Sequence, residues 1–209
     1  MRDLFIDCSF GLSGDMLLAG LLDMGVPFKV IEQSLSDLGM DKRYSFKIEE
    51  SHSMGFRGSR VFVKPLVNDP GKRTWIEIRD LINSSKLKEE IKVKVLNVFE
   101  ILAKAEASVH GVSVDKVHFH EIGSIDTIFD IVGVCSALES LNLNNIYSTY
   151  PPSGSGTIQT NHGELNVPVP VVLELAKIFK INLFGTKDQN IGELTTPTGL
   201  ALLIVFSDY

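Results

Sequence analysis

The segment from Ile125 to about Leu141 constrains the fold most, because its apolar residues recur at helical spacing. Ser124 directly before it is a good helix N-cap, since its hydroxyl can accept a hydrogen bond from the first turn. The apolar face consists of Ile128, Ile131, Val132, Cys135 and Leu138. A helix with such a face must bury it, so we expect this helix in the core of the protein.

The opposite face of the same helix carries two carboxylates. Asp126 and Asp130 form an i, i+4 pair and share this face with Gly133 and Ala137. Carboxylates beside small residues favour a metal ion or the close approach of another backbone. The alternative is that Asp126 complements the helix N-terminus and that Asp130 is solvated. The residues of this helix leave both interpretations open.

Short strands and helices alternate along the rest of the chain. The pattern predicts an α/β fold, with α+β as the alternative, in which helices pack on a sheet and the chain starts with a strand, a glycine-containing loop and a helix. The linker 65–73 allows two subdomains, 1–66 and 72–209. We expect strands at 4–6, 44–49 and 59–64, a hairpin turning at 162–163, and helices at 16–24, 27–38, 74–81, 86–109, 170–179 and from 197.

Composition excludes several classes of partner. The 209 residues carry a formal net charge of −6, so there is no basic excess to neutralise the phosphates of a nucleic acid. No apolar run reaches the roughly 18–20 residues of a membrane helix, and the first residues lack a signal peptide pattern, so we expect a cytoplasmic protein. Only Cys8 and Cys135 are present, so a bound metal must rely on histidine, carboxylate or its own ligand.

A metal site is predicted at the segment that contains His118, His120 and Glu121. On an extended segment, two histidines two residues apart lie on one face, and the glutamate could complete or orient the pair. His162, at a predicted turn, could reach a site built elsewhere, whereas the helix dipole explains His110. The alternative is a surface loop with incidental histidines.

Two helix starts are candidate phosphate sites, because the free amide groups of a helix N-terminus favour anions. One follows the loop from Asp7 to Asp15 and the other begins at Thr196-Pro197. Asp7 and Asp15 would repel a bare phosphate, so a divalent cation would have to mediate its binding. A plain strand-to-helix turn and a well-capped helix are the alternatives. The candidate cofactor-binding residues are Gly11, Ser13, Gly14, Thr196, Thr198 and Gly199, and the candidate catalytic carboxylates are Asp7, Asp15, Asp126 and Asp130.

Taken together, the motifs resemble one family, the nickel-insertion proteins that complete the nickel-pincer nucleotide cofactor of lactate racemase. The most distinctive block is Val117-His118-Phe119-His120-Glu121. The other matching residues follow in order along nearly the whole chain: Asp7-Cys8, 11–16, Glu106, His110-Gly111, 122–128, 130–133, Pro151, Gly154, Gly156, His162-Gly163, Pro168, Pro170, Glu174-Leu175, Glu193 and 196–199.

The resemblance implies a nickel chelatase of the lyase class. Such an enzyme inserts nickel into a pyridinium bis-thiocarboxylic acid mononucleotide and uses CTP with a manganese or magnesium ion. A site that must release nickel to softer thiocarboxylates suits imidazole and carboxylate donors. One departure from the family pattern lies at Cys8-Ser9-Phe10-Gly11, which gives Ser9 and Phe10 no specific role.

A second departure is length, because full-length members of the family add a comparably long C-terminal part. That part is associated with metal–CTP binding and with oligomer formation. The resemblance therefore implies that this chain is the N-terminal, nickel-facing portion, that the C-terminal half of the same protein is its partner, and that the assembly is a homo-oligomer. Two other functions stay open: a metal-dependent hydrolase of a phosphorylated or nucleotide substrate, and a non-catalytic nickel-binding or interaction module.

Overall fold

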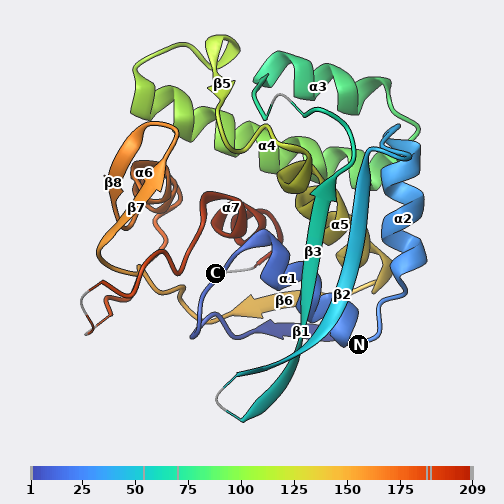
Figure 1. Cartoon of the computed structure of the whole chain (residues 1–209), viewed down its shortest axis with the longest axis horizontal. Helices are drawn as coiled ribbons and strands as arrows, with labels where there is room; N and C mark the ends of the chain where they lie inside the picture. The colour runs from blue at the N-terminus through green and yellow to red at the C-terminus, as the bar shows by residue number, and fades with distance from the viewer. Residues whose placement is uncertain (1, 54, 70, 187, 189, 208–209) are drawn as a thin grey trace.

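The computed structural model describes residues 2–53, 55–69, 71–186, 188 and 190–207. Helix α5 (Ile125–Ser140) lies at its centre and packs against α1 (Gly14–Asp23), α2 (Phe28–Asp37) and α4 (Glu89–His110) (Figure 1). Its predicted apolar face is buried, as expected. The face with Gly133 and Ala137 is buried as well, because α1 and α2 cover it. The prediction of a core helix at this position is confirmed.

The strands form small sheets of two strands each, and together with the helices they confirm a mixed α/β fold. Strand β1 (Asp3–Ile6) pairs in parallel with β6 (Asn145–Ser148), while β2 (Tyr44–Ser53) and β3 (Phe56–Pro65) form a long antiparallel hairpin. Two further antiparallel pairs join β4 (Arg73–Thr74) to β5 (His118–Phe119) and β7 (Thr157–Thr160) to β8 (Gly163–Asn166). The described residues contain no single large sheet on which the helices pack.

Most helix boundaries follow from local capping. Thr74 and Glu77 form a capping box at the start of α3 (Trp75–Ser84), and Gly111 ends α4 in the left-handed conformation with φ +65°. Proline occupies the first turn of both α6 (Pro170–Phe179) and α7 (Pro197–Phe206). A short 3₁₀ turn (Val114–Lys116) links α4 to β5. The helices expected from the sequence are therefore present, with boundaries shifted by a few residues.

The first turn of α1 lies against the second turn of α5 and the first turn of α7. A Cβ atom on Gly14 of α1 would lie 2.9 Å from Cβ of Asp130 and 3.1 Å from Cγ2 of Thr198. The backbone amide of Thr196 donates to the carbonyl of Leu12 at 2.9 Å, which holds the start of α7 beside that of α1. Glycine at position 14 thus lets α1 approach both α5 and α7, because a side chain there would press against Asp130 and Thr198.

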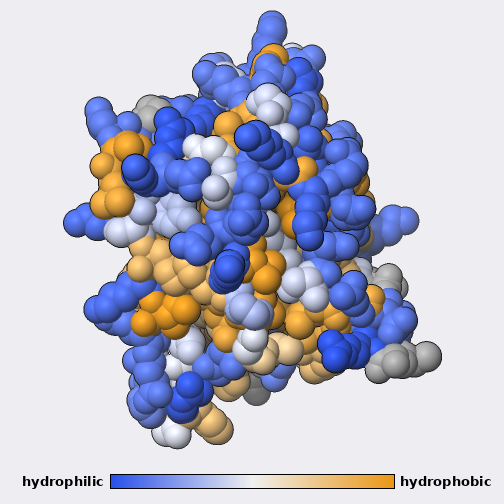
Figure 2. Space-filling model, turned by 90° about the vertical axis from the view of Figure 1, so that its right-hand side faces the viewer, coloured by the Kyte–Doolittle hydropathy of each residue, from blue (hydrophilic) through white to orange (hydrophobic). Residues whose placement is uncertain are grey.

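One large hydrophobic core runs through the molecule and includes residues from both 1–66 and 72–209. Figure 2 shows that hydrophobic residues also gather on the lower part of one outer face. An apolar hollow of about 270 Å³ lies among β1, α1 and α7, with Leu4, Met16 and Phe206 in its lining. Within the described part of the chain, no helix combines the length and the apolar character needed to cross a membrane.

Candidate metal centre and adjoining cleft

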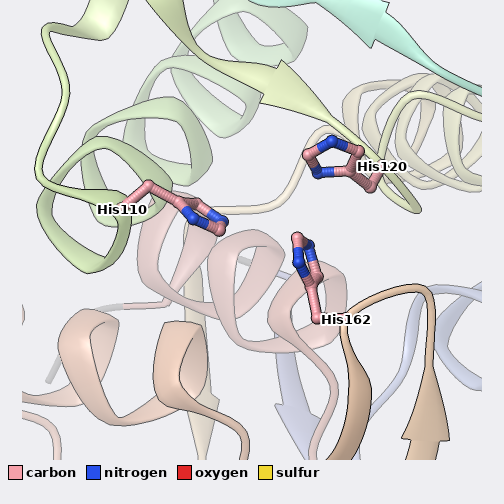
Figure 3. A group of neighbouring side chains, drawn as sticks. All are labelled: His110, His120 and His162. Atoms are coloured by element: carbon pink, nitrogen blue, oxygen red, sulfur yellow. The ribbon is translucent and has the colours of Figure 1, made fainter.

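Three histidines from distant parts of the chain come together. One ring nitrogen from each of His110, His120 and His162 can be chosen so that all three lie within 4.8 Å of one another. The centroids of the His120 and His162 rings are 4.7 Å apart, and those of His110 and His162 are 5.1 Å apart. In Figure 3 the three side chains converge from separate segments on a shared space. We call these residues the histidine group; nitrogen donors at such spacing suit a transition metal ion.

Each histidine is positioned by its own element. His110 is the last residue of α4, immediately before the left-handed Gly111. His120 follows β5, where the strand has just ended at Phe119. His162 lies in the turn between β7 and β8, and its backbone amide donates to the hydroxyl of Thr160 at 3.0 Å. The group therefore depends on how three elements pack together.

The β7–β8 turn is held directly against the His120 segment. The side-chain amide of Asn161 donates to the carbonyl of His120 at 3.1 Å, and the backbone amide of Asn161 donates to the Glu121 carboxylate at 3.0 Å. These two hydrogen bonds bring His162 beside His120. The role of Glu121 in this structure is thus to hold the turn that carries His162.

An ion pair in the preceding linker holds the other side of the His120 segment. Arg73 and Asp69 pair at 2.7 Å, and their side chains are only 17% and 7% exposed. The second Asp69 oxygen accepts a hydrogen bond from the amide of Ile125 at 2.8 Å, while the Arg73 guanidinium donates to the carbonyl of Gly123. We call this the Asp69–Arg73 clip; it ties the turn after His120 to the start of α5.

The hollow around the histidine group has a volume of about 220 Å³ and combines apolar walls with carboxylates. Burial lowers the pKa of His120, and the neighbouring His162 lowers it further, so this imidazole is biased toward its neutral, ligand form. Burial also raises the pKa of Glu106, and it raises the pKa of Glu193 to about 7, with Glu121 adding like-charge repulsion. The hollow thus contains acidic groups that a cation would stabilise in their ionised form.

A second, more polar hollow of about 500 Å³ adjoins the first and shares His120, Glu121 and Glu193 with it. We call it the acidic cleft. Residues at the starts of α1, α5 and α7 line it. Burial raises the pKa of Asp130 to about 8, and the nearby carboxylates of Asp15 and Asp126 contribute. Its other lining residues include Ser13, Gly14, Ser124, Thr196 and Thr198.

The predicted metal-binding residues are only partly brought together. His120 and His162 belong to the histidine group, whereas His118 does not. The extended segment expected to place His118 and His120 on one face ends at Phe119, and the chain then bends into the turn before α5. His118 is exposed and pairs with Thr74 in the β4–β5 ladder. Glu121 lines the hollow without being a member of the group.

The predicted cofactor-binding and catalytic residues also divide into two sets. Ser13, Gly14, Thr196, Thr198 and three of the carboxylates line the acidic cleft. Gly11 and Gly199 are instead packing positions: the Gly11 amide donates to the carbonyl of Cys8, and a Cβ atom on Gly199 would lie 2.4 Å from the carbonyl oxygen of Leu12. Asp7 lies outside the cleft and accepts hydrogen bonds from Ser9, which lower its pKa.

Sequence reasoning assigned no role to three residues of this region: His110, Glu106 and Glu193. The helix dipole accounts for His110 in the sequence, because nothing local links it to residues 120 and 162. One signal was available, since Glu106 and His110 are an i, i+4 pair and therefore neighbours on a helix surface. Glu193 lies in the segment before α7, which is held by bridges from Gly192 to Ser155 and from Thr195 to Leu12. No local pattern reveals these contacts.

Comparison with known proteins gives a consistent result. A family profile described as "Nickel insertion protein" matches residues 4–209. A Synechococcus sp. (strain JA-3-3Ab) protein with the provisional name of nickel insertion protein is 39% identical over 100% of this chain and 52% of its own length. Proteins of Akkermansia muciniphila and Clostridium kluyveri, both named pyridinium-3,5-bisthiocarboxylic acid mononucleotide nickel insertion protein, are 39% and 37% identical over 97% and 98% of this chain and 51% and 53% of their own lengths. The chain thus spans about half the length of these curated relatives. No solved structure gave a significant match.

Proposed function

Because the chain belongs to the nickel insertion protein family, we propose that it holds nickel at the histidine group and delivers it to a pyridinium bis-thiocarboxylic acid mononucleotide. The observation that carries this proposal is the convergence of His110, His120 and His162 in one hollow. The names of the relatives support the choice of substrate. The activity is that of a nickel chelatase, a lyase that forms metal–ligand bonds, acting in the cytoplasm.

The donor set suits transfer rather than permanent storage. Imidazole nitrogens bind nickel well, while thiocarboxylate sulfurs are softer donors and two of them lie on one substrate. A nucleotide that offers both sulfurs can therefore remove the ion from three separate side chains. The bias of His120 toward the neutral form keeps a nitrogen lone pair available for the incoming ion.

The acidic cleft is the proposed place for the phosphate of the mononucleotide and for a manganese or magnesium ion that acts with CTP. Helix N-termini favour phosphate, and carboxylate oxygens are the donors that such hard cations prefer. Asp15, Asp126 and Asp130 would hold the cation, with Ser13, Gly14, Thr196 and Thr198 facing the phosphate. The residues shared with the histidine hollow support a single nucleotide that reaches both places.

We further propose that the chain works with the other half found in the longer relatives. The chain corresponds to 51–53% of the lengths of the relatives described above. In this proposal the present chain supplies the nickel-facing portion, and the C-terminal half supplies contacts to CTP and the surfaces of a homo-oligomer. Cofactor maturation then requires both halves, whereas nickel binding requires only this one.

The test measures nickel affinity by isothermal titration calorimetry for the wild type and for single alanine variants. Replacement of His110, His120 or His162 should weaken nickel binding by at least about tenfold, or about 1.4 kcal/mol. His118→Ala is the matched control from the same segment, and His52→Ala is an exposed control from β2. Unchanged affinity in the three variants of the group, or a loss confined to His118→Ala, would overturn the assignment.

A metal-dependent hydrolase is the second candidate, because three histidines around one ion leave a coordination position for an activated water. This function predicts metal-dependent cleavage of a model phosphoester that is lost in His120→Ala. Under our proposal the rate of that cleavage equals the buffer rate. Nickel binding without transfer to the mononucleotide, even with the other half supplied, would indicate a non-catalytic nickel-binding module instead.

A further inference from the structure

Glu106 faces the same hollow as the histidine group from one turn earlier on α4. Its Oε2 atom lies 3.2 Å from Nε2 of His110, and its side chain is only 13% exposed. Glu106 is one of the residues that match the family pattern, but that match alone assigns its carboxylate no role. Its position raises the question of which positive charge compensates it, because a buried carboxylate is costly unless it is paired or binds a metal.

The charge of Glu106 has no permanent partner among the described residues. Its ion-pair contact there is with His110, an imidazole that is charged only when protonated, and no lysine or arginine comes within 4.0 Å. Another glutamate of the same helix shows the contrast. Glu100 pairs with Lys104 at 2.7 Å with the same i, i+4 spacing, but both side chains are about half exposed. Glu106 is therefore a largely buried carboxylate of α4 whose only ion-pair contact among the described residues is a histidine.

We propose that Glu106 is a fourth protein donor to the nickel ion, beside the three histidines. This inference rests on the proposed function and deepens it. Two donors about 2.1 Å from one metal ion are about 3.0 Å apart at a right angle and about 3.4 Å apart at a tetrahedral angle. The 3.2 Å between Oε2 of Glu106 and Nε2 of His110 falls in this range. With Nε2 as the nitrogen of His110 that binds nickel, the two atoms have the spacing of neighbours in one coordination shell.

A carboxylate donor would also offset the positive charge that a nickel ion brings into the hollow. Three neutral imidazoles leave both positive charges of nickel uncompensated in a partly apolar pocket, and one carboxylate halves that charge. Glu106 is outside the set of three mutually close nitrogens, so its flexible side chain moves toward the common centre when the ion binds. Nickel then replaces the missing cation partner of Glu106.

The test compares Glu106→Gln with Glu100→Gln, which removes the exposed carboxylate of the same helix. Cobalt(II) serves as a coloured probe of the coordination shell, and nickel affinity is measured by calorimetry. Glu106→Gln should bind nickel at least about tenfold more weakly and should change the visible absorption of bound cobalt, whereas Glu100→Gln should change neither. If Glu106 only orients His110, the glutamine carbonyl preserves that hydrogen bond, so wild-type affinity and an unchanged cobalt spectrum would overturn the inference.

A second measurement uses the wild-type chain, so it does not depend on whether a variant folds. A crystal structure of the nickel-loaded wild-type chain should place a Glu106 oxygen about 2.1 Å from the ion, and a separation beyond about 3 Å would contradict the proposal. Failure of the proposed function looks different. In that case the wild type binds no nickel, or His162→Ala binds it as tightly as the wild type does.

Discussion

Asp130 shows how burial at a contact between two helices changes the protonation of a single carboxyl group. It lies at the contact between α5 and the first turn of α1, where Gly14 allows the two helices to approach. Burial there, together with the nearby charges of Asp15 and Asp126, raises the pKa of Asp130 to about 8 from its usual 3.8. The side chain is therefore protonated in the metal-free protein near neutral pH, and a cation in the acidic cleft would favour its ionised form.

The stability of the metal-free protein should fall as pH rises from about 4 to about 8. In this range the folded state binds the Asp130 proton and the unfolded state has lost it, so each pH unit costs up to about 1.4 kcal/mol. Asp130→Asn removes this titration, so its urea-unfolding free energy should decline less with pH and should exceed that of the wild type at pH 8. Asp80→Asn changes an exposed carboxylate and is the control. Parallel pH profiles for Asp130→Asn and the wild type, measured with a chelator present, would contradict the argument.

At the scale of elements, the Asp69–Arg73 clip determines where His120 lies. It connects the linker before α3 to the turn between β5 and α5, and it supplies an acceptor for the first turn of α5. The carboxylate of Asp69 thus has two functions, as counter-ion of Arg73 and as a cap of the helix. Its loss leaves a largely buried guanidinium without a counter-ion.

Replacement of Asp69 with alanine should lower the free energy of unfolding by about 3 kcal/mol or more, because it leaves a buried charge unpaired. It should also weaken nickel binding, since the segment that carries His120 is no longer fixed to α5. Lys104→Ala, which breaks an exposed pair on α4, should cost less than about 1 kcal/mol and leave nickel affinity unchanged. Chemical denaturation and calorimetry measure both effects; equal losses of stability in the two variants would refute the role of the clip.

The elements themselves were largely predictable, whereas the site was predictable only in part. Spacing and capping residues indicated α5, the end of α4 at Gly111 and the hairpins, because these depend on neighbours in sequence. The structure does not bring His118 into the histidine group with His120, since the short strand β5 ends at Phe119. His110 joined the group through the packing of α4 against distant segments. Local periodicity contains no information about such contacts.

At the scale of the whole molecule, the histidine group brings together the end of α4, the segment after β5 and the β7–β8 turn. The β7–β8 hairpin that carries His162 is mostly exposed or half-buried along both strands. Its turn contacts the His120 segment through the two hydrogen bonds of Asn161. A nickel ion bound to all three rings would add a link between this hairpin, the end of α4 and the turn after β5.

Nickel should therefore stabilise the protein globally and the hairpin in particular. A ligand that binds only the folded state at a free concentration of 100 times its Kd adds about 2.7 kcal/mol to the free energy of unfolding. Beyond that uniform gain, hydrogen exchange of the amides in 157–166 should slow more than that of β2 and β3, because the extra link restrains the hairpin. Magnesium, which prefers oxygen donors, should leave exchange in the hairpin unchanged.

Asn161→Ala should retain nickel-dependent protection with a lower affinity for nickel, since the ion itself then holds the turn. Protection that spreads evenly over all elements would instead mean that nickel binds without bridging these three segments.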